Sequence, residues 1–167
     1  MQDHRDYEIS LADDVNYMHQ ALAKAHAAAR RGEIPVGALV VWHGPTGNEV
    51  IGHGANRREA QSDPTAHAEI VALRQAGRAM GSWRLSDCTL YVTLEPCPMC
   101  AGAMVNARLW RLVFGCHDPT AGAVETLFRL ADDPRLNHQM HITSGICADA
   151  AREALQEFFR VRRAKRR

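Results

Sequence analysis

Two short motifs about thirty residues apart constrain this chain most strongly. One is the His-Ala-Glu sequence of residues 67–69, and the other is the Cys-Pro-Met-Cys sequence of residues 97–100. Together they supply three side chains that bind zinc well, the imidazole of His67 and the thiolates of Cys97 and Cys100. Any fold of this chain must therefore bring the two motifs to one point.

The second motif suits the start of a helix. Cys97 and Cys100 are three residues apart, so on a helix they lie on one face and can bind a single ion. Pro98 is well suited to the first helical position. The N-terminus of a helix favours the thiolate over the thiol, and the thiolate is the form that binds metal.

Glu69 indicates what such a metal would do. It is two residues beyond His67, which is too close for an easy second bond to the same ion from a continuous helix. A structural zinc site has four protein ligands, whereas a catalytic site keeps one position for water. A carboxylate beside that water can accept its proton and pass it to a substrate. The motifs therefore predict a hydrolytic zinc centre, a signature typical of zinc-dependent base deaminases.

Other interpretations explain the motifs less well. A Cys-x-x-Cys pair alone is also typical of redox and structural sites. A thioredoxin-like interpretation leaves residues 67–69 unexplained, and a structural zinc site needs a fourth ligand such as Cys88, Cys116 or His53. We therefore favour the catalytic site.

Composition predicts a single domain spanning residues 1–167. The chain has 46% hydrophobic and 23% charged residues, which is ordinary for a globular protein of this size. Its longest apolar stretch, residues 36–42, is too short to cross a membrane, and the polar start has no apolar signal region. Three of the five cysteines lie outside the metal motif and are expected as reduced thiols. These features predict a cytoplasmic protein with no membrane contact.

Strand and helix patterns alternate along the chain. The expected strands are residues 36–42 and 50–56, joined as a hairpin by turn residues 44–48, then 89–94, 112–115 and 139–143. The expected helices run from a cap at Asp13 or Asp14 to about Arg31, from near Thr65 to about Ala76, from the cysteine motif to about Arg108, and from Ala148 past Phe159. This order predicts an α/β fold, a three-layer α/β/α domain around a mixed five-stranded sheet. Both metal motifs then begin helices at an edge of the sheet, where ligands bind in such folds.

Two segments carry a resemblance to a known family. Residues 63–70 (Asp-Pro-Thr-Ala-His-Ala-Glu-Ile) and 93–104 (Thr-Leu-Glu-Pro-Cys-Pro-Met-Cys-Ala-Gly-Ala-Met) resemble the bacterial tRNA-specific adenosine deaminases. The likeness extends over about residues 17–163. It implies a cytidine deaminase-like fold, a homodimer, one zinc ion per subunit, and conversion of the wobble adenosine of a tRNA anticodon to inosine.

The resemblance also implies a role for individual residues. His67, Cys97 and Cys100 match the family's zinc ligands, and Glu69 matches its proton shuttle. The other matches are Asn56 for a hydrogen bond to the flipped base, the backbone amide of Ala68 and the chain at Leu94 and Glu95 for the pocket lining, Asp118 for a contact to the sugar beside the target base, and Phe159 with the following arginines for packing against the anticodon loop.

Taken without the resemblance, several of these residues have simpler explanations. Asn56 fits a turn residue at the end of a strand, and Asp118 fits the cap of a short helix near Ala123. Of the adjacent Phe158 and Phe159, one is expected to face the core, and it is the resemblance that assigns Phe159 to RNA.

The C-terminal helix and tail, about residues 148–167, concentrate positive charge. Residues 160–167 contain six basic side chains and no acidic one, while the whole chain has a formal charge of +1. Subtracting these six leaves −5 for the remainder. A basic tail on an acidic domain fits phosphate contacts at one edge, although a solvated terminus would have the same composition. Anticodon loops are single-stranded, so a bound base can be splayed out without opening a duplex.

Two features of the sequence depart from the family pattern. The hairpin tip at residues 42–49 is longer than usual in the family, and Cys116 stands where a small residue is expected.

The sequence leaves two alternative functions open. The alternative enzyme is a deaminase of guanine or another free base or nucleotide. The non-enzymatic alternative is a zinc-stabilised RNA-binding module.

Overall fold

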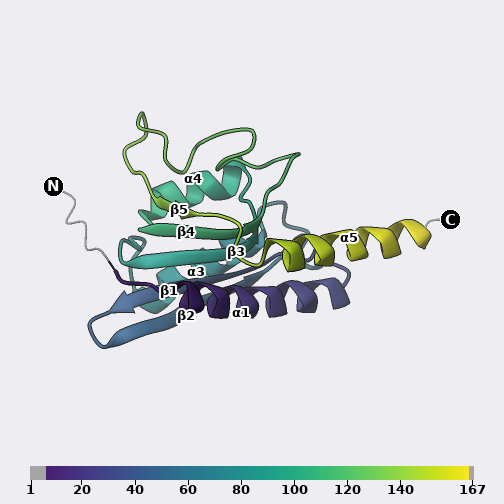
Figure 1. Cartoon of the computed structure of the whole chain (residues 1–167), viewed down its shortest axis with the longest axis horizontal. Helices are drawn as coiled ribbons and strands as arrows, with labels where there is room; N and C mark the ends of the chain where they lie inside the picture. Colours follow the sequence, from purple (N-terminus) through teal and green to yellow (C-terminus); the bar gives the residue numbers. More distant parts are fainter. Residues whose placement is uncertain (1–6, 166–167) are drawn as a thin grey trace.

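A five-stranded sheet lies between two layers of helices in the computed structural model, which describes residues 7–165 (Figure 1). The strands are β1 (Gly37–Gly44), β2 (Gly47–Ala55), β3 (Cys88–Leu94), β4 (Arg111–Cys116) and β5 (His141–Thr143). Their order in the sheet is β2-β1-β3-β4-β5, with β1 antiparallel to both neighbours and β3, β4 and β5 parallel. The predicted mixed five-stranded sheet is confirmed.

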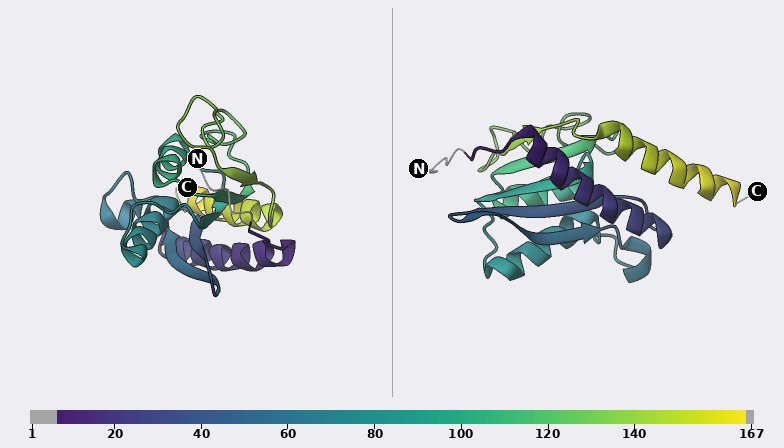
Figure 2. Two further views of the ribbon diagram at one scale, coloured as in Figure 1. Left: turned by 90° about the vertical axis from the view of Figure 1, so that its left-hand side faces the viewer. Right: turned by 60° about the horizontal axis from the view of Figure 1, so that its bottom comes forward.

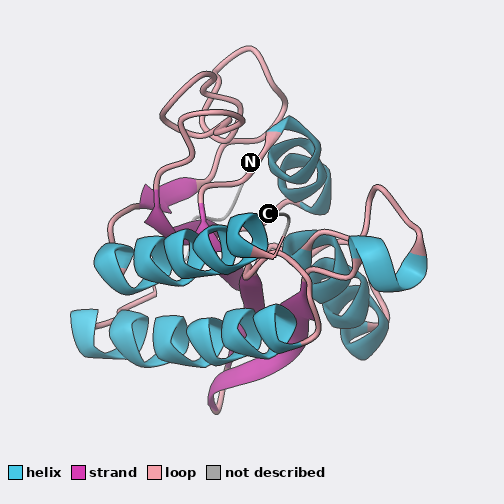
Figure 3. Cartoon of the chain, turned by 90° about the vertical axis from the view of Figure 1, so that its right-hand side faces the viewer, coloured by secondary structure: helices cyan, strands magenta, loops and turns pink. Residues whose placement is uncertain are grey.

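Helices cover both faces of this sheet, as the alternating pattern predicts. The helices are α1 (Leu11–Arg30), the short α2 (Arg58–Gln61), α3 (Ala68–Met80), α4 (Pro98–Ala107) and α5 (Ala148–Ala164). Helices α1 and α5 lie side by side on one face, and α3 and α4 pack on the other (Figures 2 and 3). The three-layer α/β/α architecture is therefore confirmed.

The two apolar layers follow from the alternation of side chains along the strands. In β1, Leu39 and Val41 pack with α1, whereas Val40 packs with α3 on the opposite side. Strand β3 is buried along nearly its whole length, so its sequence is almost continuously apolar. This central strand leads directly into the cysteine motif and fixes its position.

A buried polar cluster fastens α1 to the sheet. Asp14 is 3% exposed, and its side chain accepts two hydrogen bonds from the Arg111 guanidinium, at 2.8 and 2.7 Å, and one from the Tyr91 hydroxyl at 2.8 Å. The expected cap at Asp13 or Asp14 is wrong, because Ser10 caps α1 and forms a reciprocal capping box with Asp13. Asp14 instead forms the buried hydrogen bonds that join α1 to β3 and β4.

Three local features also differ from the sequence prediction. Helix α3 begins at Ala68, with His67 as its N-cap, two residues beyond Thr65. Strands β1 and β2 remain paired as far as Gly44 and Gly47, so the longer hairpin tip is additional paired strand. Residues 117–140 contain neither helix nor strand, so no short helix follows Asp118. Within residues 7–165, every helix is too short or too polar to cross a membrane.

Candidate active site

The first motif is placed by the close packing of α3 on β2. Gly54 faces the start of α3, and a Cβ atom at Gly54 would lie only 1.8 Å from the carbonyl oxygen of Ala68. Just before the helix, Asp63 accepts hydrogen bonds from the backbone N–H and hydroxyl of Thr65, at 2.8 and 2.7 Å. This turn leaves His67 extended at the N-cap and puts Glu69 in the first helical turn, where it is 4% exposed.

The second motif is placed by the end of β3. Cys97 is the N-cap of α4, Pro98 opens the helix as predicted, and Cys100 lies inside the first turn. The Sγ atoms of Cys97 and Cys100 are each 3.6 Å from Nδ1 of His67. Among the described residues these three side chains form the only cluster of His, Cys, Asp or Glu ligands able to hold a metal ion. Cys88, Cys116 and His53 are not part of it, so none of them acts as a fourth ligand.

The electrostatics of the cluster suit metal binding and proton transfer. The hydrogen bond from Cys100, together with that from His67, lowers the pKa of Cys97 to about 4, despite burial, which opposes this. The same bond and burial raise the pKa of Cys100, and the bond to Cys97 raises that of His67. Burial raises the pKa of Glu69 to about 7. Glu69 can therefore both accept and release a proton near neutral pH.

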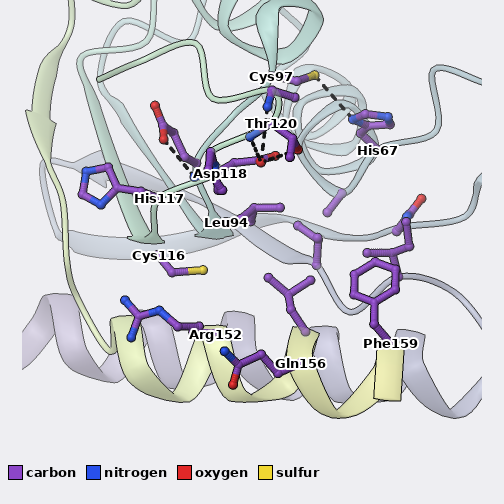
Figure 4. A pocket seen from close by; sticks show the side chains of 18 of the residues that line it. His67, Leu94, Cys97, Cys116, His117, Asp118, Thr120, Arg152, Gln156 and Phe159 are labelled. Carbon is purple, nitrogen blue, oxygen red and sulfur yellow. Dashed lines mark hydrogen bonds between the residues drawn. The ribbon is translucent and has the colours of Figure 1, made fainter. Parts of the chain in front are cut away.

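A cavity of about 680 Å³ opens beside this cluster. Figure 4 shows His67 and Cys97 on one side of the cavity, and Arg152, Gln156 and Phe159 projecting from α5 on the other. The structure brings nearly all the residues expected at the site to this cavity: Asn56, His67, Ala68, Glu69, Leu94, Glu95, Cys97, Asp118 and Phe159. Cys100 is buried behind them.

Two of these residues form hydrogen-bonded turns as well as lining the cavity. Asn56 is 5% exposed, lines the cavity, and accepts a hydrogen bond from the backbone N–H of Arg58 at 3.2 Å. Asp118 also lines the cavity, while its Oδ1 atom accepts bonds from the backbone N–H and hydroxyl of Thr120, at 2.8 and 2.7 Å. Each residue therefore forms a turn in the wall of the cavity, and Asp118 caps no helix.

Helix α5 contributes more to the cavity than the sequence predicted. Arg152, Gln156, Phe159 and Arg163 all line it, at spacings that put them on one helical face. The helical periodicity that relates these residues to Phe159 is the sequence signal that points to them. Phe158 is half-buried and stacks edge-on against Phe159, at 5.5 Å between ring centroids, so the expectation that it enters the core is not met.

Ile34, Val36 and Arg58 also line the cavity, as do residues 116, 117 and 119–121. The sequence offered no distinctive signal for these residues. They reach the site only because separate loops converge at this end of the sheet.

The fold and the site define the class of the protein. A His-Cys-Cys cluster at two helix starts, a buried carboxylate beside it and a cavity at the sheet edge are the features of a hydrolytic deaminase.

Comparison with known proteins identifies the family. The profile of the MafB19-like deaminases matches residues 12–163. The tRNA-specific adenosine deaminase of Haemophilus influenzae is 46% identical over 92% of this chain and 87% of its own length. That of Bacillus subtilis is 42% identical over 94% of this chain and 95% of its own. The chain belongs to the tRNA-specific adenosine deaminase family.

Solved structures support the same family assignment. A structure from a study of A-to-I editing by tRNA:A34 deaminases superposes with a TM-score of 0.78 and 42% identity, over 84% of this chain and 99% of its own. The guanine deaminase of Bacillus subtilis superposes less well, with a TM-score of 0.57 and 30% identity over 67% and 80% of the two chains. The predicted cytidine deaminase-like fold is confirmed.

Proposed function

We propose that this protein converts the wobble adenosine of a tRNA anticodon to inosine by hydrolysis. The observation that carries the proposal is the cavity, which places the buried carboxylate of Glu69 beside the His-Cys-Cys cluster and is lined on the α5 side by Arg152 and Arg163. The family relationship supports the choice of adenosine in tRNA.

The metal proposed for the cluster is zinc. Zinc–sulfur bonds are about 2.3 Å and zinc–nitrogen bonds about 2.0–2.1 Å, so tetrahedral angles need a nitrogen–sulfur separation of about 3.6 Å. The two separations from His67 Nδ1 are 3.6 Å. When bound, zinc would lower the pKa of a coordinated water molecule and so supply the nucleophile.

The remaining chemistry falls to the protein's side chains. Glu69 would accept a proton from the attacking water, deliver it to a ring nitrogen of adenine, and assist the departure of ammonia. Adenosine and water are thereby converted to inosine and ammonia. Asn56 and the backbone N–H of Ala68 line the cavity where they could hold the base in place.

RNA recognition is assigned to the mouth of the cavity. Arg58, Arg152 and Arg163 line it and can contact phosphates, and Phe159, which is 39% exposed, offers an aromatic face for stacking. Asp118 would contact the sugar next to the target base. The expected tail contacts at residues 166 and 167 lie outside the described residues. A tRNA substrate also implies a cytoplasmic location.

The proposal predicts inosine in an anticodon stem-loop that carries adenosine at the wobble position. With contacts to about three phosphates of a single-stranded loop, RNA binding should weaken roughly 20-fold when the salt concentration rises from 50 to 200 mM. Mass spectrometry of the nucleosides and binding titrations at the two salt concentrations measure these effects. Ammonia release from free guanine, with no inosine in the RNA, would instead identify a guanine deaminase.

The homodimer is proposed to form over α3 and α4. These helices and the segment after α3 line an apolar groove on the side away from α1 and α5, formed mainly by Ile70, Leu73, Gly77, Trp83, Leu85, Ala103 and Ala107. Trp83 is 60% exposed, a large apolar surface that a second copy of the chain would bury.

A charge placed in this groove should therefore dissociate the dimer. The wild-type protein is expected at twice its chain mass of 18.5 kDa in light scattering. Ala103→Glu should shift it to a monomer at micromolar concentration, whereas Ala23→Glu, on the exposed side of α1, should remain dimeric. A dimeric Ala103→Glu variant would show that the subunits associate elsewhere.

A further inference from the structure

Glu95 makes an unusual set of contacts for a residue beside an active site. It follows β3 directly, is 2% exposed, and its carboxylate accepts five hydrogen bonds from a single loop. The donors to Oε1 are the backbone N–H groups of Val124, Glu125 and Thr126, at 3.1, 2.8 and 2.9 Å, and the donors to Oε2 are the backbone N–H of Asp118, at 3.0 Å, and the hydroxyl of Thr126.

The loop that Glu95 binds is a wall of the cavity. Residues 118–121 line it, and Asp118 is the residue assigned to the sugar beside the target base. Residues 117–140 have no helix or strand among them, so the shape of this loop depends on specific hydrogen bonds. The loop backbone is pressed against the carboxylate, because a Cβ atom at Gly122 would lie 2.3 Å from Glu95 Oε2.

The same short segment also holds the metal cluster. Glu95 is two residues before Cys97, its own N–H donates to the carbonyl of Cys116 at 2.9 Å, and the carbonyl of Pro96 accepts from Ala123 at 2.8 Å. The turn that carries a metal ligand is thus joined to both ends of the 118–126 loop. Any shift of the loop relative to the metal cluster must break these bonds.

We propose that Glu95 is a positioning residue that holds the 118–126 loop in the shape that presents Asp118 to the RNA. It acts through the loop, which its carboxylate binds at both oxygens, and this role adds to the pocket-lining role implied by the family resemblance. The assignment rests on the proposed function and adds a specific determinant of substrate placement to it.

The donor pattern explains why a carboxylate is needed. An ionised carboxylate accepts hydrogen bonds at both oxygens and donates none, which matches a site where four N–H groups and a hydroxyl converge. In Glu95→Gln the amide oxygen can keep the three bonds at Oε1. The NH₂ group must then face the N–H of Asp118, so the variant should release the loop selectively at its Asp118 end.

The decisive experiment is a double-mutant cycle in the full-length, zinc-loaded protein. Glu95→Gln and Asp118→Ala are each expected to lower kcat/KM on the anticodon stem-loop by about 10- to 100-fold, in line with the loss of charged hydrogen bonds. The double variant should have a kcat/KM little lower than either single variant, because both substitutions remove the same contact between the Asp118 side chain and the RNA. Glu49→Gln, a matched change at an exposed position, should leave kcat/KM unchanged.

Hydrogen exchange gives a second readout that does not depend on activity. Glu95→Gln should accelerate amide exchange at the Asp118 end of the loop, residues 118–122, while residues 98–107 of α4 keep their protection and the zinc content stays at one per chain. If Glu95→Gln does not fold, Thr126→Val removes only the hydroxyl donor and should show the same non-additivity with a smaller loss.

The outcomes separate the two proposals. A wild-type protein that forms no inosine contradicts the proposed function, whereas the exchange experiment still tests the role of Glu95. Independent, multiplicative losses in the cycle, or unchanged exchange in residues 118–122, would overturn the positioning role.

Discussion

Replacing Glu69 with glutamine is expected to lower inosine formation by about 10³- to 10⁴-fold, the upper part of the usual range for a lost general acid–base group. The amide has nearly the shape of the carboxyl group but cannot accept the water proton or return it. Glu69 is 4% exposed, so a bulk water molecule cannot readily replace it as the proton acceptor. Burial also raises its pKa to about 7. Single-turnover assays with saturating RNA measure this loss directly.

Metal and RNA binding should survive the substitution. We expect one zinc ion per chain by elemental analysis and an RNA dissociation constant close to that of the wild type. Removing zinc with a chelator should abolish activity in the wild type, and adding zinc should restore it. Full inosine formation by Glu69→Gln would exclude Glu69 as the proton shuttle. RNA binding without inosine formation, in the wild type as in the variant, would instead support the zinc-stabilised RNA-binding module.

Gly54→Ala is expected to destabilise the protein by about 3 kcal/mol or more, at or beyond the upper end for overpacked interiors. The added Cβ atom would meet three backbone atoms of α3, the oxygen and carbon of Ala68 at 1.8 and 2.8 Å and the nitrogen of Ala72 at 2.9 Å. Backbone cannot rotate away as a flexible side chain can, so the helix itself must move. Because this helix begins at the His67 and Glu69 motif, the variant should also bind zinc weakly.

Gly102→Ala is the matched control for this prediction. A Cβ atom at Gly102, inside α4, would have no neighbour within 4 Å. Alanine is favoured over glycine in a helix, so this variant should be more stable by roughly 0.5–1 kcal/mol. Urea denaturation and zinc analysis of both variants test the pair. Wild-type stability and zinc content in Gly54→Ala would show that α3 tolerates displacement.

The chemistry of the site was readable because it is local. His67 and Glu69 are two residues apart, Cys97 and Cys100 are three apart, and each pair consists of the N-cap of a helix and a residue in its first turn. Backbone conformation over so few residues follows from the residues themselves, such as Pro98 at the helix start. The strands were equally readable, because buried strands are recognisable as short apolar runs.

The sequence-based prediction of the α1 cap is wrong because several neighbouring polar residues could each have formed the cap. Ser10, Asp13 and Asp14 can all cap a helix, and nothing in the local sequence shows that Asp14 pairs with Arg111, 97 residues away. Glu95 lines the cavity, as the family resemblance implies, but its hydrogen bonds to the 118–126 loop, 23 to 31 residues further along, leave no signal in the local sequence.

The sequence by itself indicated the chemistry proposed for this protein: the candidate metal ligands, the carboxylate beside them, and the order of strands and helices that carries them. Only the tertiary structure decided the shape of the substrate cavity, which combines Asn56 at the end of β2, the 118–126 loop held by Glu95 and one face of α5. The physical reason is that a ligand motif is set by backbone geometry over a few residues. A cavity wall depends on which distant segments pack together, and that is decided by burial and hydrogen bonding across the whole chain.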